Sequence, residues 1–200
     1  MGKLELNKKQ KKDAMYQTAF ELFTTKGLTK TTISDIVEKA GVAKGTFYLY
    51  FKDKYDIRNK LVSRKTGELF HRARLALSDT GLEAFDDQLL FIVDYILNEL
   101  EQNHPLLIFI SKNLSWGMFR GILDREIQEE EDPYGSAFPD ILQQAEMKYR
   151  DPELMLFSIL ELVGSACYSC ILFQQPVPLS SYKPDLYHTI RAILSAHEYK

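Results

Sequence analysis

Residues 42 to 54 contain most of the side chains in this sequence that could act on another molecule. They read V-A-K-G-T-F-Y-L-Y-F-K-D-K, with four aromatic residues in five positions and lysines at 44, 52 and 54. Lysine carries positive charge to a phosphate, and tyrosine can pack on a sugar while its hydroxyl donates a hydrogen bond. The segment therefore indicates contact with a nucleic acid, provided that the surrounding elements hold these groups outward.

Reactive and metal-binding side chains are sparse elsewhere. Cys167 and Cys170 form a C-x-x-C pair, but the pair lies within a predicted helix without a second pair or a nearby histidine, which disfavours zinc or redox chemistry. The four histidines show no ligand spacing, and the sequence has no nucleophile elbow, phosphate loop or recognisable pair of catalytic acids. We therefore expect no enzyme activity, no metal and no cofactor.

Charge is divided unevenly along the chain. Up to residue 65 there are 15 Lys and Arg against 7 Asp and Glu, a net charge of +8, whereas the remainder has 10 against 21, a net charge of −11. The first part suits a polyanion and the second does not, although lysines that only solvate an N-terminal segment would give the same count.

The sequence indicates a cytoplasmic protein without a membrane partner. No apolar run reaches about 18 residues without polar interruption. The N-terminal lysines are not followed by the apolar stretch of a secretory signal.

Hydrophobic periodicity predicts an all-α fold, because apolar residues recur at spacings of three and four along nearly every long segment. A short helix is expected between Thr32, which with Asp35 is placed to form a capping box, and Gly41, which ends it. A second helix of about two turns should follow, with Phe47 and Phe51 facing the core. Two short helices around a glycine turn have helix-turn-helix spacing.

The span from about Lys12 to Ile57 resembles the DNA-binding domain of the TetR (tetracycline-repressor) family. The resemblance lies in F-T-T-K-G-L-T-K-T-T-I-S-D-I-V-E-K-A-G-V-A-K-G-T-F-Y-L-Y-F-K-D-K, which agrees at about a dozen positions in register and covers about a quarter of the chain. It implies a three-helix DNA-binding domain over residues 1–55, a connecting fourth helix over 53–77, and a larger helical domain over 56–200 that binds an effector and dimerises.

The resemblance also implies DNA-facing roles. The residues concerned are Thr32, Lys44, Gly45, Thr46, Tyr48, Tyr50 and Lys54. Thr32 would offer its hydroxyl and backbone N–H to a phosphate at a helix N-terminus. The three residues from Lys44 would lie nearest the base edges of double-stranded DNA, with Lys44 able to donate to guanine O6 and N7. The tyrosines would hold backbone or a thymine methyl, and Lys54 a phosphate.

Two features near this segment have less definite readings. Gly45 costs about 1 kcal/mol of helix propensity relative to alanine, which fits the close approach of another backbone. The lysine-rich leader from Lys8 to Lys12 is either a solvated tail or a contact to phosphate or the minor groove.

The C-terminal part predicts further helices and a subunit interface. One helix should run from residue 105 to about 123, followed by an exposed loop over 126–139 that is rich in charge, Pro and Gly. Residues 152–173 are apolar nearly all round, so a partner subunit is expected to bury the remaining faces. The resemblance implies the same homodimer, formed with a second helix over 184–196, and a C2 dimer suits a palindromic operator.

A ligand cavity in the C-terminal domain is implied by the resemblance. Candidate lining residues are Phe91, Phe109, Asn113, Trp116, Phe119, Phe157, Glu161 and Tyr168. Aromatic residues at helical spacing would serve equally as ordinary core. Glu161, in the middle of the apolar helix, would hold a cationic ligand, pair with an arginine such as Arg120, or face water.

The leading hypothesis is a dimeric transcriptional repressor that an unidentified small molecule releases from its operator. One alternative is a coactivator or adaptor that acts through a protein partner without a small ligand, and a C-terminal core without a cavity would favour it. Another is a helical small-molecule-binding protein or enzyme with a retired DNA-binding head. The intact set of Lys44, Thr46, Tyr48, Tyr50 and Lys54 argues against that alternative.

Overall fold

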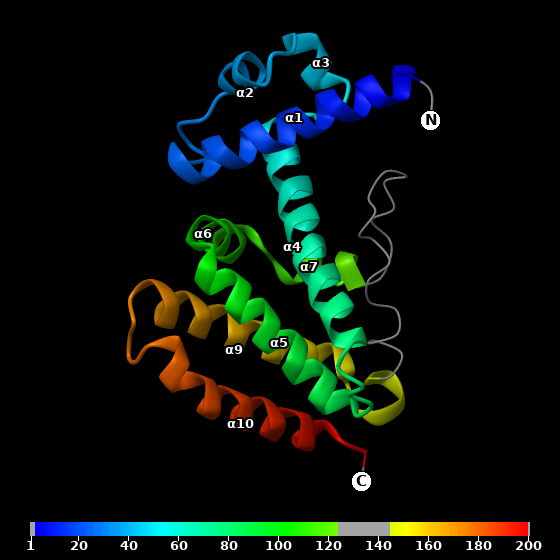
Figure 1. The fold of residues 1–200 in the computed structure, drawn as a ribbon, viewed down its shortest axis with the longest axis vertical. Coiled ribbons are helices and arrows are strands. Elements are labelled where there is room, and N and C mark those ends of the chain that lie inside the picture. Colours follow the sequence, from blue (N-terminus) through cyan, green and yellow to red (C-terminus); the bar gives the residue numbers. More distant parts are fainter. Residues whose placement is uncertain (1–2, 124–144, 200) are drawn as a thin grey trace. The chain divides into compact units, whose positions relative to one another are not determined.

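A computed structural model describes residues 3–123 and 145–199, and these residues form helices joined by short connections, which confirms the all-α prediction (Figure 1). The chain divides into two compact units, Met1–Ser63 and Arg64–Lys200. The division falls inside α4 (Lys54–Ser78), the helix that also contains the boundary expected after residue 55. The loop predicted over 126–139 lies outside the described residues.

The N-terminal unit packs three helices and the start of α4 around an aromatic and aliphatic core. The helices are α1 (Lys3–Thr25), α2 (Ile33–Ala40) and α3 (Lys44–Tyr48). Met15, Ile36, Phe47 and Phe51 are almost completely buried, which confirms the predicted inward face of both phenylalanines. The rings of Phe47 and Phe51 lie 5.3 Å apart, and Tyr16 meets Phe51 edge-on at 5.2 Å.

Two expectations about this unit were wrong. The lysine-rich leader is not a tail: residues 8–12 belong to α1, because lysine and glutamine are good helix formers and continue the helix toward the N-terminus. α3 has five residues rather than about two turns. It ends early because Asp53 caps α4, its carboxylate accepting from the backbone N–H groups of Tyr55 (2.7 Å) and Asp56 (2.9 Å).

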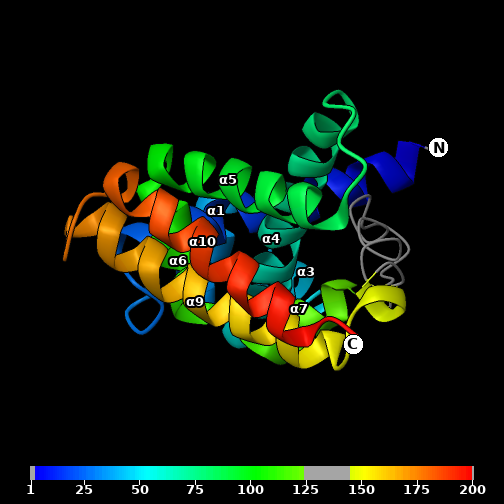
Figure 2. The ribbon, with the colours of Figure 1, turned by 90° about the horizontal axis from the view of Figure 1, so that it is seen from below.

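The C-terminal unit contains the rest of α4 and five further described helices. These are α5 (Phe85–Gln102), α6 (His104–Asn113), α7 (Trp116–Leu123), α9 (Pro152–Leu172) and α10 (Leu179–His197). α9 and α10 run side by side, and α5 packs against both (Figure 2). Buried leucines and isoleucines from these helices form the core.

The single helix expected over 105–123 is broken into α6 and α7. Asn113 ends α6 by donating from its side chain to the carbonyl of Phe109 (2.7 Å), and Leu114 then adopts an extended backbone. Ser115 opens α7, since its hydroxyl accepts from the backbone N–H of Met118 (3.4 Å) and its carbonyl from that of Phe119 (3.0 Å). The break is caused by side chains that compete for backbone hydrogen-bonding groups. The spacing of apolar residues does not reveal this competition.

α10 begins at Leu179 instead of near Pro184, which lies inside the helix. Leu179 is buried, and the carbonyl of Pro178 accepts from the N–H groups of Ser181 and Tyr182, both at 3.1 Å. Proline removes one donor from the helix, but Ser180, four residues before Pro184, is exposed, so water can satisfy its carbonyl. Burial of Leu179 therefore outweighs the preference of proline for a first turn.

A polar cluster fastens α10 to α5. Lys183 donates to Asp94 and to Asn98, both at 2.6 Å, and the hydroxyl of Tyr187 also donates to Asp94. Burial raises the pKa of Asp94, but the hydrogen bonds from Lys183 and Tyr187 outweigh it and leave the pKa below its ordinary value. Asp94 therefore stays ionised at neutral pH, which keeps this link charged.

Candidate DNA-binding face and ligand cavity

Thr32 and Asp35 form the predicted capping box at the start of α2. The hydroxyl of Thr32 accepts from the backbone N–H of Asp35 (3.1 Å), and the Asp35 carboxylate accepts from the backbone N–H of Thr32 (2.8 Å). The backbone N–H that the sequence assigned to a phosphate is therefore already used. Thr32 is exposed, and its hydroxyl, like its backbone N–H, contributes to the low pKa of Asp35.

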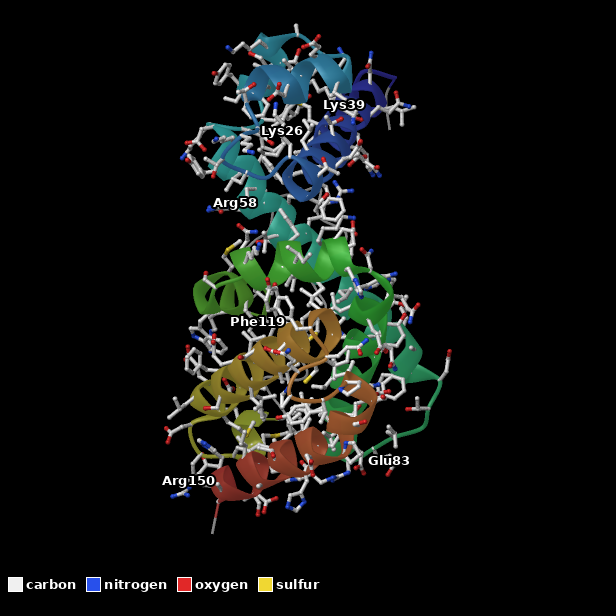
Figure 3. The ribbon with its side chains drawn as sticks, turned by 90° about the vertical axis from the view of Figure 1, so that its left-hand side faces the viewer. Lys26, Lys39, Arg58, Glu83, Phe119 and Arg150 are labelled. Atoms are coloured by element: carbon white, nitrogen blue, oxygen red, sulfur yellow. The ribbon has the colours of Figure 1, made fainter. Side chains whose placement is uncertain are left out.

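Two ion pairs fix α2 against α1. Lys26 donates to Asp35 at 2.7 Å, and Lys39 pairs with Glu21, so these two lysines of the basic head are held within the unit (Figure 3). The hydrogen bond from Lys26, followed by those from Thr32, lowers the pKa of Asp35 from its ordinary 3.8 to about 2.

This pKa shift predicts an acid-dependent contribution to stability. Because the pKa of Asp35 is lower in the folded state, its stabilising effect is fully present above about pH 4 and is lost as pH falls toward 2. We expect Asp35→Asn to have a lower melting temperature than the wild type at pH 6, with the gap closing between pH 4 and pH 2. A gap that does not change with pH would show that the charge of Asp35 contributes nothing.

The side chains expected to face DNA lie at and just after the N-terminus of α3. Lys44 and Gly45 are exposed, Tyr48 is 54% exposed, and Thr46 and Tyr50 are half-buried. Within the described part of the chain, Lys44 has no ion-pair partner, unlike Lys26 and Lys39. The face therefore presents one free cation beside hydroxyl and aromatic groups.

Gly45 has open space around it. A Cβ placed there would meet no other atom of the described chain within 4 Å, so internal packing does not require glycine at this position. The space suits the close approach of another molecule, as the sequence suggested.

Leu49 is a candidate contact that the sequence reasoning missed. Its side chain is 80% exposed, between Tyr48 and Tyr50. The sequence does indicate that this side chain is exposed. A residue two positions from both Phe47 and Phe51 must point away from the face that these two phenylalanines bury. An exposed leucine beside tyrosines offers apolar contact to a thymine methyl.

Lys54 occupies a different position from the one expected of a phosphate contact. Its ammonium donates to three backbone carbonyls, those of Leu28 (3.0 Å), Thr29 (3.2 Å) and Thr31 (3.2 Å). An ammonium has three protons, and here each has an acceptor in the loop between α1 and α2. The sequence could not show this, since the partners lie more than 20 residues away.

The C-terminal unit contains a cavity of about 630 Å³. Its wall is mainly aliphatic and comes from α4, α5, α6, α7 and α9, together with Leu114. Typical members are Leu69, Phe70, Leu89, Ile92, Ile96, Leu107, Ile110, Phe119, Leu156, Ile159, Val163 and Tyr168. A volume of this size is in the range of small-molecule sites in proteins.

Three of the eight residues predicted for the cavity line it, namely Phe119, Glu161 and Tyr168 (Phe119 is labelled in Figure 3). The other five are engaged elsewhere. Trp116 and Phe157 pack edge to face at 5.4 Å, and Asn113 caps α6. Phe91 packs near Tyr95 at 6.5 Å, and Phe109 is buried core. Aromatic type was a poor guide to the lining, because most of the wall is aliphatic.

Residues 16–61 match a family described as bacterial regulatory proteins, tetR family. These residues place the N-terminal unit of the chain in the tetR family. An HTH-type transcriptional regulator of Bacillus subtilis, YvdT, is 57% identical over 44 residues, which are 22% of this chain and 23% of YvdT. The match thus spans about a quarter of that relative's length.

Solved structures extend the likeness of this chain to its whole fold. The fatty acid degradation regulator FadR of Bacillus halodurans has a TM-score of 0.63 at 18% identity, over 90% of this chain and 94% of that one. The FadR of Bacillus subtilis, solved with stearoyl-CoA, has a TM-score of 0.59 at 21% identity, over 88% and 96%. At these identities the likeness establishes the fold.

Glu161 lies on the exposed side of α9 and also lines the cavity. Arg120, one of its predicted partners, pairs instead with Glu153 at 3.2 Å. Among the described residues Glu161 has no ion-pair partner, which agrees with the alternative that it faces water.

Thr66, which no sequence signal identified, is the one buried polar side chain without a hydrogen-bond partner in the parts of the chain that the structure describes. It is 2% exposed and lines the cavity from α4. A buried hydroxyl left unpaired costs about 1–3 kcal/mol.

Cys167 and Cys170 are free and buried, and Cys167 also lines the cavity. Burial, with a smaller effect of Cys170, raises the pKa of Cys167 to about 12, so the thiol is protonated at neutral pH. Residues 3–123 and 145–199 contain no group of three or more His, Cys, Asp or Glu placed to hold a metal ion.

The contacts of Lys54 lead to a test that separates its two possible roles. If its ammonium braces the loop before α2, Lys54→Ala should lower the stability of the N-terminal unit by about 1.5–3 kcal/mol. DNA affinity should then fall without a change in its dependence on salt.

The neighbouring Lys52→Ala is the matched control for this test, because Lys52 is exposed and its removal should leave stability within about 0.5 kcal/mol. Denaturation and DNA titration at several salt concentrations would measure both variants. A salt slope reduced by about one in Lys54→Ala, with unchanged stability, would identify a phosphate contact and contradict the brace.

Proposed function

We propose that this chain is a sequence-specific transcriptional repressor. It binds a palindromic operator in double-stranded DNA as a homodimer, and a small molecule in the C-terminal cavity releases it. The main support for this proposal is the combination of two features in one chain. The TetR-type N-terminal unit has an exposed, cationic α3 N-terminus, and the C-terminal unit has an apolar cavity of about 630 Å³. We place its action in the cytoplasm.

For DNA binding, the N-terminus of α3 is proposed to enter the major groove. Lys44 is the one side chain among residues 44–46 that can donate to both guanine O6 and N7, so it carries direct readout. Tyr48, Tyr50 and Leu49 supply backbone and thymine-methyl contacts beside it. Thr32, exposed at the N-terminus of α2, is placed to meet a phosphate.

For dimerisation, the exposed face of α9 is the proposed interface. Leu154 on this helix is 56% exposed, and Phe157 is also exposed. Among the described helices, α9 is long and apolar enough to cross a bilayer, judged by length and composition alone. Of its most apolar 18-residue stretch, 33% is buried. In a homodimer the partner's α9 and α10 cover this face, which explains an apolar helix that its own chain buries on one side.

For release, the aliphatic wall of the cavity favours a mainly apolar ligand. The solved FadR of Bacillus subtilis carries stearoyl-CoA, so long-chain acyl compounds are the first class to screen. Such a ligand acts if it binds more tightly to a conformation whose two recognition helices no longer match successive major grooves. A cavity of this size counts against the coactivator alternative, which needs an occluded core.

Selection of bound fragments from randomised duplex DNA by the purified full chain tests this function. We expect a palindromic consensus whose half-sites repeat at a whole number of helical turns. Acyl compounds would then be tested for release of that duplex. Failure to enrich any sequence would contradict the repressor and favour a chain that acts without specific DNA contact.

A further inference from the structure

The unpaired hydroxyl of Thr66 is set in an apolar part of the cavity wall. Leu69 and Phe70 follow it at three and four positions, so all three share one face of α4, and all three line the cavity. Phe70 packs against Phe119 at 5.6 Å. On this face of α4 a bound molecule therefore meets one hydroxyl beside two hydrocarbon side chains.

The hydroxyl is available because it does not take its usual local partner. A threonine inside a helix commonly donates to the carbonyl three or four residues earlier, and Thr24 does so with Phe20 (2.8 Å). Thr66 makes no such bond within residues 3–123 and 145–199. Buried polar groups in proteins are nearly always paired, so one that lines a cavity is a candidate ligand contact.

The charged residues of the cavity wall differ from Thr66 in their exposure to solvent. Lys112 on α6 and Glu161 on α9 also line the cavity, but both are exposed to solvent. A charge placed beside Thr66 would be desolvated among hydrocarbon groups without a counter-ion, which is unfavourable. The group that pairs with Thr66 must therefore be uncharged.

We propose that the cavity selects a mainly apolar ligand whose buried part carries one uncharged oxygen, of the alcohol, ketone or ester type, and that this oxygen pairs with the hydroxyl of Thr66. This inference rests on the ligand site of the proposed function and adds the chemistry of recognition to it. Any charged group of the ligand lies toward Lys112 and Glu161.

The test uses two fluorescent probes of equal size, 2-naphthol and 2-methylnaphthalene, which differ by a hydroxyl in place of a methyl group. Their affinities would be measured for the wild-type full chain, Thr66→Val, which keeps the shape and removes the hydroxyl, and Thr66→Ser, which keeps the hydroxyl. We expect the preference for 2-naphthol to fall about three- to tenfold in Thr66→Val and to be retained in Thr66→Ser.

Thermal stability without probe supplies an independent control. Thr31 is as buried as Thr66, at 1% exposed, but its hydroxyl donates to the carbonyl of Gly27 at 2.8 Å. Thr31→Val should therefore melt at a lower temperature than the wild type, whereas Thr66→Val should melt at the same or a higher temperature. A clear loss in Thr66→Val would mean that its hydroxyl is already paired, which overturns the inference.

The outcomes separate this inference from the proposed function, because probe binding is measured without DNA. If both probes bind and the preference is the same in the wild type and Thr66→Val, the Thr66 contact is overturned while the cavity stands as a ligand site. If neither probe binds the wild type, the Thr66 contact is overturned, while release of the operator duplex by acyl compounds still decides the ligand-controlled repressor.

Discussion

A chain carrying Leu154→Glu and Phe157→Glu is expected to be monomeric and to bind its operator roughly 100-fold or more weakly. Both side chains are exposed on α9 in the single chain, and neither lines the cavity. The two carboxylates would be buried without partners in a dimer interface, which is unfavourable. A monomer binds one half-site only. In a dimer, binding of the first DNA-binding domain holds the second one near the other half-site at a high effective concentration, and the monomer lacks this gain.

The measurements are sedimentation equilibrium and titration of a duplex that contains the operator. Leu75→Glu is the matched control, since Leu75 on α4 is 57% exposed, against 56% for Leu154, but lies on another helix. The control should remain dimeric and bind normally. A double variant that stays dimeric at the concentrations of the wild type would remove the α9 face from the interface.

Phe47→Ala is expected to destabilise the N-terminal unit by about 3–5 kcal/mol. Phe47 is fully buried and packs on Phe51, with ring centroids 5.3 Å apart, so truncation leaves a cavity where α3 meets the core. Such a loss approaches the whole stability of a small domain. The recognition helix would then be unfolded in much of the population, and DNA binding would fall with it.

Leu49→Ala, two positions away, is the control that separates folding from contact. Because Leu49 is 80% exposed, its truncation should change stability by no more than about 0.5 kcal/mol, while DNA affinity falls if the side chain meets a base. Chemical denaturation followed by circular dichroism, with DNA titration, would measure both. Equal destabilisation by the two variants would contradict the packing described for α3.

Sequence reasoning succeeded where local physics decides the structure. The capping box of Thr32 and Asp35 and the stop at Gly41 depend on neighbours within a few residues, and Phe47 and Phe51 are spaced to share a buried face. The exposure of Leu49 follows from the same spacing, although the prediction did not include this residue.

It failed where distant parts of the chain decide. The carbonyl partners of Lys54 lie in the preceding loop, and burial of Leu179 moves the start of α10 ahead of Pro184. The cavity wall is assembled from several helices, and Thr66 matters because nothing near it accepts its proton. None of these relations is expressed in the spacing of residues along one helix.

The most direct test of the central claim is an equilibrium titration of the full chain with its selected duplex and with a scrambled duplex of the same composition, at several salt concentrations. Specific DNA binding through α3 predicts an affinity for the selected duplex at least about 1,000-fold higher than for the scrambled one, with Lys44→Ala reducing that ratio. Equal, salt-sensitive affinity for both duplexes would contradict sequence-specific repression.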